Sequence, residues 1–129
     1  MTIIRTEEGQ ENIYNGAGLQ VAGTRGPGLQ GLSPRELLEA SLGLCISISL
    51  QKVMDVDGVD YDKSELVVEV SSAKPADGGN YFDQFQVELT LPKQLDPGYK
   101  QHLLSVVEKT CTISNTLAHN AVVTTSEAK

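Results

Sequence analysis

The sequence predicts a mixed α+β fold that combines short strands with one long apolar helix. Strand-like segments broken by turns open the chain, a strong helix start occurs at Ser33, and two segments of alternating polarity follow the helix. The 129 residues, 40% of them apolar, suit a single domain over residues 1–129. Few aromatic residues are available, so we expect an aliphatic core.

Three short strands are expected before the first helix, at residues 2–6, 12–14 and 19–22. The Asn15-Gly16 dipeptide predicts a two-residue hairpin turn, since this pair favours the tight turns that join antiparallel strands. Residues 23–31 hold four glycines and a proline, so this segment is expected to be a loop.

Residues Ser33-Pro34-Arg35-Glu36 predict the start of a helix, because they supply a preferred cap, a proline in the first turn and a glutamate three residues after the cap. The helix is expected to end near residues 55–58, where Gly58 can take a left-handed conformation.

The helix is apolar on nearly every side over residues 37–50, which is typical of a helix enclosed by protein. A small domain seldom encloses a helix completely. We therefore expect a sheet on one side and a second copy of the chain on the other, as in a symmetric homodimer. The apolar stretch is shorter than the roughly 20 residues of a membrane span and contains Glu39, so we expect a soluble protein with no membrane partner.

Two strands are expected next, at residues 65–71 and 82–91, because each alternates apolar and polar side chains. The connection at residues 74–80 is rich in turn residues, which predicts an antiparallel hairpin.

The last third of the chain predicts a helix that opens at Asp96-Pro97, breaks near Thr110 and continues as a second helical piece over residues 111–119. A final strand is expected at residues 121–125.

Composition and motifs exclude several classes of function. A net charge of −7 with scattered Lys and Arg argues against a nucleic-acid partner. The first ten residues lack the features of a secretion signal, which predicts a cytoplasmic location. Neither His102 nor His119 has the close spacing of a metal site, and residues 23–31 do not match a phosphate-binding loop, so no metal or other cofactor is expected.

Cys45 and Cys111 are the candidate reactive groups, and 66 positions separate them, so only the fold can bring them together. Cys111 is expected at the start of a helical piece, where unpaired N–H groups favour a thiolate. Cys45 lies inside a helix and would need a cation or hydrogen-bond donors from elsewhere, including a dimer partner. Buried cysteines often serve only as apolar packing residues, so this alternative stays open for both.

Glu36 is a candidate catalytic residue because it precedes Cys45 on the same helix. Nine positions place the two side chains on nearly opposite faces, so Glu36 cannot touch Cys45 within one helix. Arg35 is closer in angle but equally far along the helix axis. From spacing alone, the better role for Glu36 is partner of Ser33 in a helix cap.

The segments SPRELLEASLGLC and VVEKTCTISNTL, separated by a hairpin, resemble the OsmC/Ohr family of osmotically induced and organic-hydroperoxide-resistance proteins. The resemblance covers nearly the whole chain. It implies an α+β fold in which two chains intertwine, each with a mostly antiparallel sheet wrapped around a central apolar helix. It also implies that both cysteines lie at the dimer interface and reduce organic or hydrogen peroxides without a cofactor.

In this interpretation Cys45 attacks the peroxide and becomes a sulfenic acid, Cys111 condenses with it to a disulfide, and an external thiol or dithiol restores the pair. Characterised peroxidases of the family also use an arginine in the turn after the first strand and a glutamate ten residues before the first cysteine. Here that turn, residues 7–11, has no arginine, and Arg35 occupies the tenth position while Glu36 lies at the ninth.

This spacing resembles the family branch of uncertain activity. The alternative function is therefore a non-enzymatic ligand-binding or regulatory domain that keeps the OsmC-like fold. In a third interpretation the chain is a structural dimer with two packing cysteines.

Overall fold

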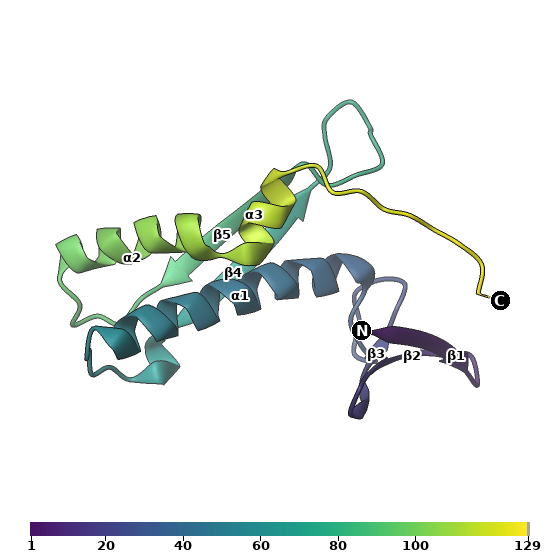
Figure 1. Ribbon diagram of the computed structural model, residues 1–129, viewed down its shortest axis with the longest axis horizontal. Helices are drawn as coiled ribbons and strands as arrows, with labels where there is room; N and C mark the ends of the chain where they lie inside the picture. Colours follow the sequence, from purple (N-terminus) through teal and green to yellow (C-terminus); the bar gives the residue numbers. More distant parts are fainter. Residues whose placement is uncertain (129) are drawn as a thin grey trace. The chain divides into compact units, whose positions relative to one another are not determined.

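The computed structural model describes residues 1–128, in which strands and helices are combined in the expected α+β class (Figure 1). The elements follow the order β1 (Ile3–Glu7), β2 (Gln10–Asn15), β3 (Gly18–Gly23), α1 (Pro34–Val56), a short 3-10 helix (Lys63–Glu65), β4 (Val67–Ala73), β5 (Gln84–Thr90), α2 (Pro97–Thr110) and α3 (Thr112–Ala118).

Contacts between Cα atoms divide the chain into two compact units. The first comprises Met1–Ala40 and Ser72–Phe85, and the second comprises Ser41–Ser71 and the chain from Gln86 onward. Helix α1 and strands β4 and β5 contribute residues to both units. The expectation of one domain over residues 1–129 stays a prediction, and its last residue lies outside the described part of the chain.

In the first unit, β1, β2 and β3 form an antiparallel sheet in sequence order. Strands β1 and β2 pair from Ile3 opposite Tyr14 to Glu7 opposite Gln10. The two residues between them, Glu8 and Gly9, have φ angles of 52° and 76°. Positive φ at both central positions is the turn geometry whose twist matches that of paired strands.

The expected hairpin at Asn15-Gly16 is present, but its turn is shifted by one residue. Asn15 pairs with Gly18, so the two loop residues are Gly16 and Ala17. The Asn15 side-chain oxygen accepts the Ala17 N–H at 2.9 Å, which closes the turn from its first position. The asparagine therefore stabilises the turn through its side chain.

Helix α1 begins at the expected cap. The Ser33 N–H and hydroxyl donate to Glu36 Oε1 at 3.0 and 2.9 Å, and the Glu36 N–H donates to Ser33 Oγ at 3.3 Å. This reciprocal pair satisfies backbone donors that a helix start leaves without partners. The local sequence thus fixes where the helix begins.

The end of α1 also follows the prediction. Gly58 has a φ of 68°, its N–H donates to Asp55 O at 3.2 Å, and the Val59 N–H donates to Met54 O at 2.9 Å. These two bonds form the Schellman arrangement, in which a left-handed glycine closes the last helical turn.

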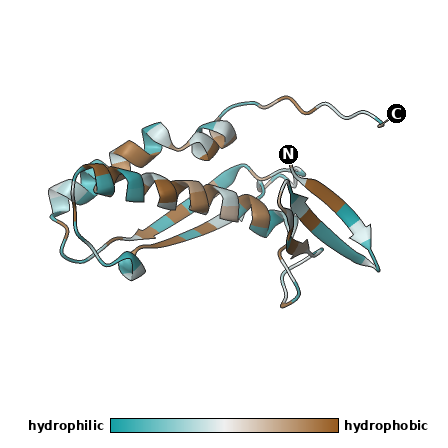
Figure 2. Cartoon of the chain, turned by 60° about the horizontal axis from the view of Figure 1, so that its bottom comes forward, coloured by the Kyte–Doolittle hydropathy of each residue, from teal (hydrophilic) through white to brown (hydrophobic). Residues whose placement is uncertain are grey.

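One stripe of α1 is buried in the second unit, formed by Leu42, Ile46, Leu50 and Met54 at a spacing of four residues. Leu44 and Ile48, in contrast, have exposed fractions of 64% and 43%. Figure 2 shows that apolar colour continues along much of the helix. Within residues 1–128, α1 is the helix whose length and composition would allow it to cross a membrane, a criterion that core helices of soluble proteins also meet.

Gly43 allows α1 to approach strand β4 closely. A Cβ atom at this position would lie 3.2 Å from Val70 Cγ2 and 3.7 Å from Val68 Cγ1. Val68 and Val70 lie on the less exposed face of β4, as their alternation predicts. The helix therefore packs on this strand through a residue that has no side chain.

Strands β4 and β5 form a two-stranded sheet and run in opposite directions, as expected (Figure 1). Helix α2 begins at the predicted cap, where an Asp96 carboxylate oxygen accepts the Gly98 N–H at 3.0 Å. Its inner side buries Leu103 and Val107 completely or nearly so. The predicted break near Thr110 separates α2 from α3.

The expected last strand at residues 121–125 is wrong for this chain. The structure has no regular secondary structure over residues 120–128, and these residues are exposed. A strand needs a neighbouring strand to pair its N–H and C=O groups, and none of the described strands pairs with this segment. The sequence of this segment alone therefore does not produce a strand.

The cap of α1 makes a testable contribution to stability. We expect Ser33→Ala to lower the free energy of unfolding by about 1 kcal/mol, because the substitution leaves the Glu36 N–H without its side-chain acceptor. Urea denaturation followed by circular dichroism measures the change. Ser105→Ala, at an exposed position within α2, is the matched control, and equal losses in the two variants would contradict the cap's role.

Candidate functional site

Cys111 occupies the junction between α2 and α3. Its backbone has an extended conformation, with φ −75° and ψ 109°, and it serves as the last cap of α2 and the first cap of α3. The Cys111 N–H donates to Val107 O at 3.1 Å, and its carbonyl accepts the Asn115 N–H at 3.0 Å. Its Sγ accepts the Ser114 N–H at 3.4 Å. The break in the helix thus holds the sulfur at a defined place.

The structure brings Cys45 and Cys111 together, although they come from different helices. The Cys45 sulfur interacts with the backbone N–H of Ile113, with the Cys111 thiol and with the backbone N–H of Thr112. These interactions lower the pKa of Cys45, with the Ile113 N–H as the largest cause. Hydrogen bonds to the ionised form stabilise it, so Cys45 is the thiol prepared to become a thiolate.

Cys111 has the opposite character. Its exposed fraction is 0%, and burial is the main cause that raises its pKa, because a charge is unfavourable away from water. The neighbouring Cys45 raises this pKa further, since two adjacent sulfurs cannot both ionise easily. Cys111 therefore keeps its proton and can donate it in a hydrogen bond to the Cys45 sulfur.

This assignment reverses one expectation from the sequence. The start of α3 was expected to favour a thiolate at Cys111, but the pKa of Cys111 is raised, although the N–H groups of Ser114 and Ile113 lower it in part. The N–H groups of Ile113 and Thr112 also act on Cys45, whose pKa is lowered. The expectation was wrong because Cys111 is fully buried, and burial raises the pKa of its thiol more than the helix-end N–H groups lower it. Cys45 obtains its donors from within the same chain.

Ser49 is a neighbour of Cys45 that the sequence interpretation missed. Its hydroxyl also interacts with the Cys45 sulfur and lowers the thiol pKa. The sequence could have indicated this contact, because Ser49 lies four positions after Cys45 and residues at this spacing lie on the same face of a helix. No comparable spacing in the sequence indicates the contacts of Ile113 and Thr112 with Cys45.

Glu36 lies in the α1 cap, in agreement with its expected structural role. The Ser33 N–H, followed by the Ser33 hydroxyl, lowers the pKa of Glu36. Both Ser33 hydrogen bonds use Oε1 of the carboxylate. The catalytic role of Glu36 stays a prediction.

Arg35 is tied to neighbours in the first unit. Its Nε donates to Ser72 Oγ at 2.9 Å, and its guanidinium also donates to the Ser72 carbonyl. Ser72 Oγ in turn donates to Glu39 Oε2 at 2.8 Å, and the guanidinium lies 5.1 Å from the Phe82 ring centroid. These contacts anchor the first turns of α1 to the end of β4 and to the β4–β5 connection.

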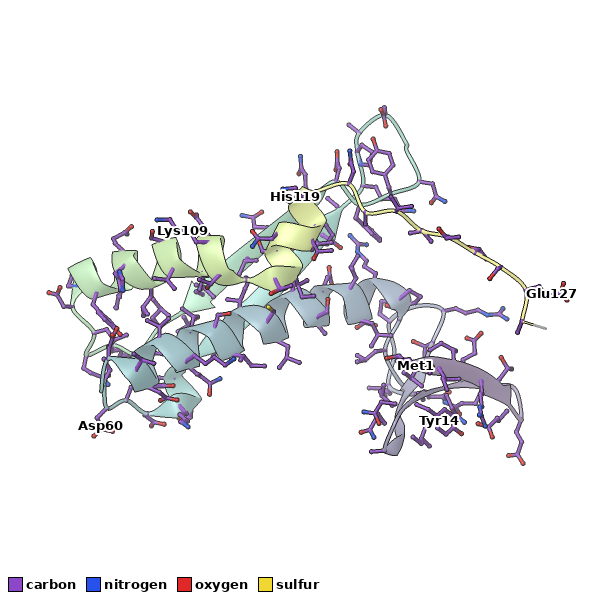
Figure 3. All side chains as sticks on the ribbon, viewed as in Figure 1. Met1, Tyr14, Asp60, Lys109, His119 and Glu127 are labelled. Atoms are coloured by element: carbon purple, nitrogen blue, oxygen red, sulfur yellow. The ribbon has the colours of Figure 1, made fainter. Side chains whose placement is uncertain are left out.

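The histidines have separate surroundings. His102 is exposed and lies near Tyr99, with ring centroids 5.9 Å apart. His119 follows the end of α3, where Nδ1 lies 2.6 Å from Asn115 O (Figure 3). Within residues 1–128, no group of three His, Cys, Asp or Glu side chains is arranged to hold a metal ion.

The hydrogen bond from Cys111 to Cys45 makes a testable contribution to thiol reactivity. We expect Cys111→Ala to raise the pKa of Cys45, because the substitution removes a donor to the thiolate. As pH increases, alkylation of Cys45 by iodoacetamide should then begin at a higher pH than in Cys111→Ser, which keeps a hydroxyl donor at that place. Mass spectrometry of the alkylated peptide measures the profile, and identical profiles would contradict the proposed contact.

Solved structures similar to this chain are OsmC-type proteins of low sequence identity. The OsmC-like protein from Mycoplasma pneumoniae is 14% identical and matches with a TM-score of 0.76, over 92% of this chain and 86% of its own. The organic hydroperoxide resistance protein OhrB of Bacillus subtilis is 24% identical, with a TM-score of 0.58 and coverage of 93% and 92%. At these identities the matches show the fold.

A third similar structure is the organic hydroperoxide resistance protein OsmC from Legionella pneumophila, which is 17% identical with a TM-score of 0.60 and coverage of 91% and 88%. No curated protein sequence matches the chain. The family model described as OsmC-like protein matches residues 26–126, which include α1, the β4–β5 sheet and both cysteines. The chain belongs to the OsmC-like protein family.

Proposed function

We propose that the protein is a thiol-dependent peroxidase that reduces organic or hydrogen peroxides through Cys45 and Cys111. The observation that carries the proposal is the pairing of two unlike thiols, one with a lowered pKa and one with a raised pKa, in direct contact. The names of similar structures, which include hydroperoxide resistance proteins, agree with this chemistry.

In the first step the Cys45 thiolate attacks the terminal oxygen of the peroxide. An S–O bond forms as the O–O bond breaks, so Cys45 becomes a sulfenic acid and the peroxide leaves as an alcohol, or as water from hydrogen peroxide, after it takes up a proton. The N–H groups of Ile113 and Thr112 hold the thiolate in place. Cys45 is also the more accessible of the two thiols.

In the second step Cys111 attacks the sulfur of the Cys45 sulfenic acid. The S–S bond forms as the S–O bond breaks, and the released hydroxide combines with the Cys111 proton to give water. An external thiol or dithiol then reduces the disulfide and is itself oxidised. We place this cycle in the cytoplasm, where such reductants keep thiols reduced.

A non-enzymatic binding or regulatory role is the second candidate. The observation in its favour is the β1–β2 turn, in which Glu8 and Gly9 occupy the central positions and no arginine is present. Under this role the Cys45 thiol would titrate near the ordinary value of about 8.5 and react slowly with peroxides. A Cys45 pKa well below that value would exclude it.

Turnover with cumene hydroperoxide and a dithiol reductant tests the proposed reaction. We expect Cys45→Ser to reduce the rate to that of the reaction without protein. Cys111→Ser should still consume one peroxide per chain and accumulate a sulfenic acid that dimedone traps, because the resolving thiol is missing. Wild-type turnover no faster than that of Cys45→Ser would reject the reaction.

We also propose that two chains associate as a homodimer through the uncovered side of α1. Leu44 and Ile48 lie on this side and are exposed, although the helix around them is apolar. Full burial of such a side chain contributes roughly 1.5–3 kcal/mol, so covering the parts of both that are still exposed would add a fraction of this from each. Large apolar side chains exposed beside one another are typical of an interaction site.

A charged residue introduced on the uncovered side of α1 tests whether this side forms the dimer interface. We expect Leu44→Glu to shift the protein towards the monomer in sedimentation equilibrium, because a carboxylate in the interface would lose its water. Leu29→Glu is the matched control, because Leu29 is fully exposed in the loop before α1, and it should leave the mass unchanged. A wild-type protein that sediments as a monomer at all concentrations would overturn the proposal.

A further inference from the structure

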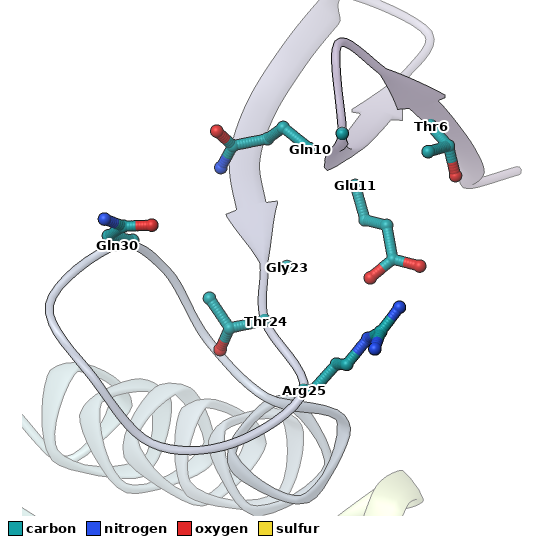
Figure 4. A pocket seen from close by; sticks show the side chains of 8 residues that line it. Thr6, Gln10, Glu11, Gly23, Thr24, Arg25 and Gln30 are labelled. Carbon is teal, nitrogen blue, oxygen red and sulfur yellow. The ribbon is translucent and has the colours of Figure 1, made fainter.

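A polar pocket lies in the first unit, between the β1–β2 turn, the end of β3 and the loop at residues 24–31 (Figure 4). Its volume is 390 Å³, within the range of roughly 300–1,000 Å³ that is usual for small-molecule sites. The polar side chains that line it are Thr6, Gln10, Glu11, Thr24, Arg25 and Gln30.

The backbone around this pocket is held by hydrogen bonds on both sides. The Thr24 N–H donates to Leu32 O at 2.9 Å and the Leu32 N–H donates to Ala22 O at 3.0 Å, which closes the loop at its base. The Thr24 hydroxyl donates to Gly26 O at 2.8 Å. The opposite wall is the paired β1–β2 hairpin. The pocket is therefore largely formed before any ligand binds.

Arg25 and Glu11 provide one charge of each sign. Their side chains point towards one another across the pocket (Figure 4). Among residues 1–128 they form no ion pair with each other or with another side chain, and the ion pair found there joins Arg35 and Glu39. A simple anion would be attracted by Arg25 and repelled by Glu11. A simple cation would be attracted by Glu11 and repelled by Arg25. The pair favours a ligand that carries both charges.

An apolar cavity of 320 Å³ shares Glu11, Gly23 and Thr24 with the polar pocket. Its other lining residues include Ile4, Ile13, Leu32 and Leu37. A ligand with its charged groups between Arg25 and Glu11 therefore has an apolar surface beside it. This surface suits an aliphatic side chain, which gains free energy when it leaves water.

We propose that this pocket binds a zwitterionic α-amino acid with an aliphatic side chain. The ligand carboxylate pairs with the Arg25 guanidinium, whose planar donors match a carboxylate in two hydrogen bonds. The ligand ammonium donates to the Glu11 carboxylate, and the side chain enters the apolar cavity. This binding site does not depend on the proposed peroxide reaction.

Titration of the full chain with L-leucine, followed by isothermal titration calorimetry, tests the proposal. We expect saturable binding of L-leucine and at least about a tenfold loss of affinity for N-acetyl-L-leucine and for L-leucinamide, because each lacks one charge. Glycine should bind more weakly than L-leucine. Equal affinity for the blocked compounds, or no binding of L-leucine, would overturn the proposal.

Substitutions in the protein locate the site. We expect Arg25→Gln and Glu11→Gln each to weaken L-leucine binding at least about tenfold, because each removes a charged hydrogen-bond partner. Arg5→Gln and Glu88→Gln make the same chemical changes outside the pocket and should bind as wild type does. If all four variants bind L-leucine with equal affinity, the proposed location of the binding site is wrong. The ligand series on the wild-type protein decides the ligand class even if a variant fails to fold.

Discussion

The interaction on which the site depends is the placement of the Cys45 sulfur over the first N–H groups of α3. These donors become available because the helix breaks at Cys111, and an unbroken helix would use them for its own backbone bonds. The same break positions the Cys111 sulfur as a further donor. One local change in the backbone thus creates both the stabilised thiolate and its protonated neighbour.

Elements with a local cause could be predicted from the sequence. The start of α1 was predicted by Ser33 and Glu36, which contact each other, and its end by Gly58, whose conformation few other residues adopt. The break near Thr110 was also predicted. In each case the residues that determine the structure lie within a few positions of it.

Features that depend on distant residues could not be predicted in the same way. The contact between Cys45 and the backbone of Ile113 joins two helices, and no spacing in the sequence indicates it. The expected strand at residues 121–125 failed for a related reason, because the residues of a segment do not show whether a partner strand lies beside it. The resemblance to the OsmC/Ohr family supplied the pairing of the two cysteines that spacing could not supply.

The close approach at Gly43 has a consequence for how this protein can vary. A methyl group there would crowd Val70 of β4, so either the Val70 side chain or the helix that carries Cys45, two positions further on, would have to shift by a few tenths of an ångström. The hydrogen bonds to the sulfur are directional, so a small displacement of α1 would weaken them without any change at the cysteines. The acidity of the thiol is therefore tied to the absence of a side chain on the opposite side of its helix.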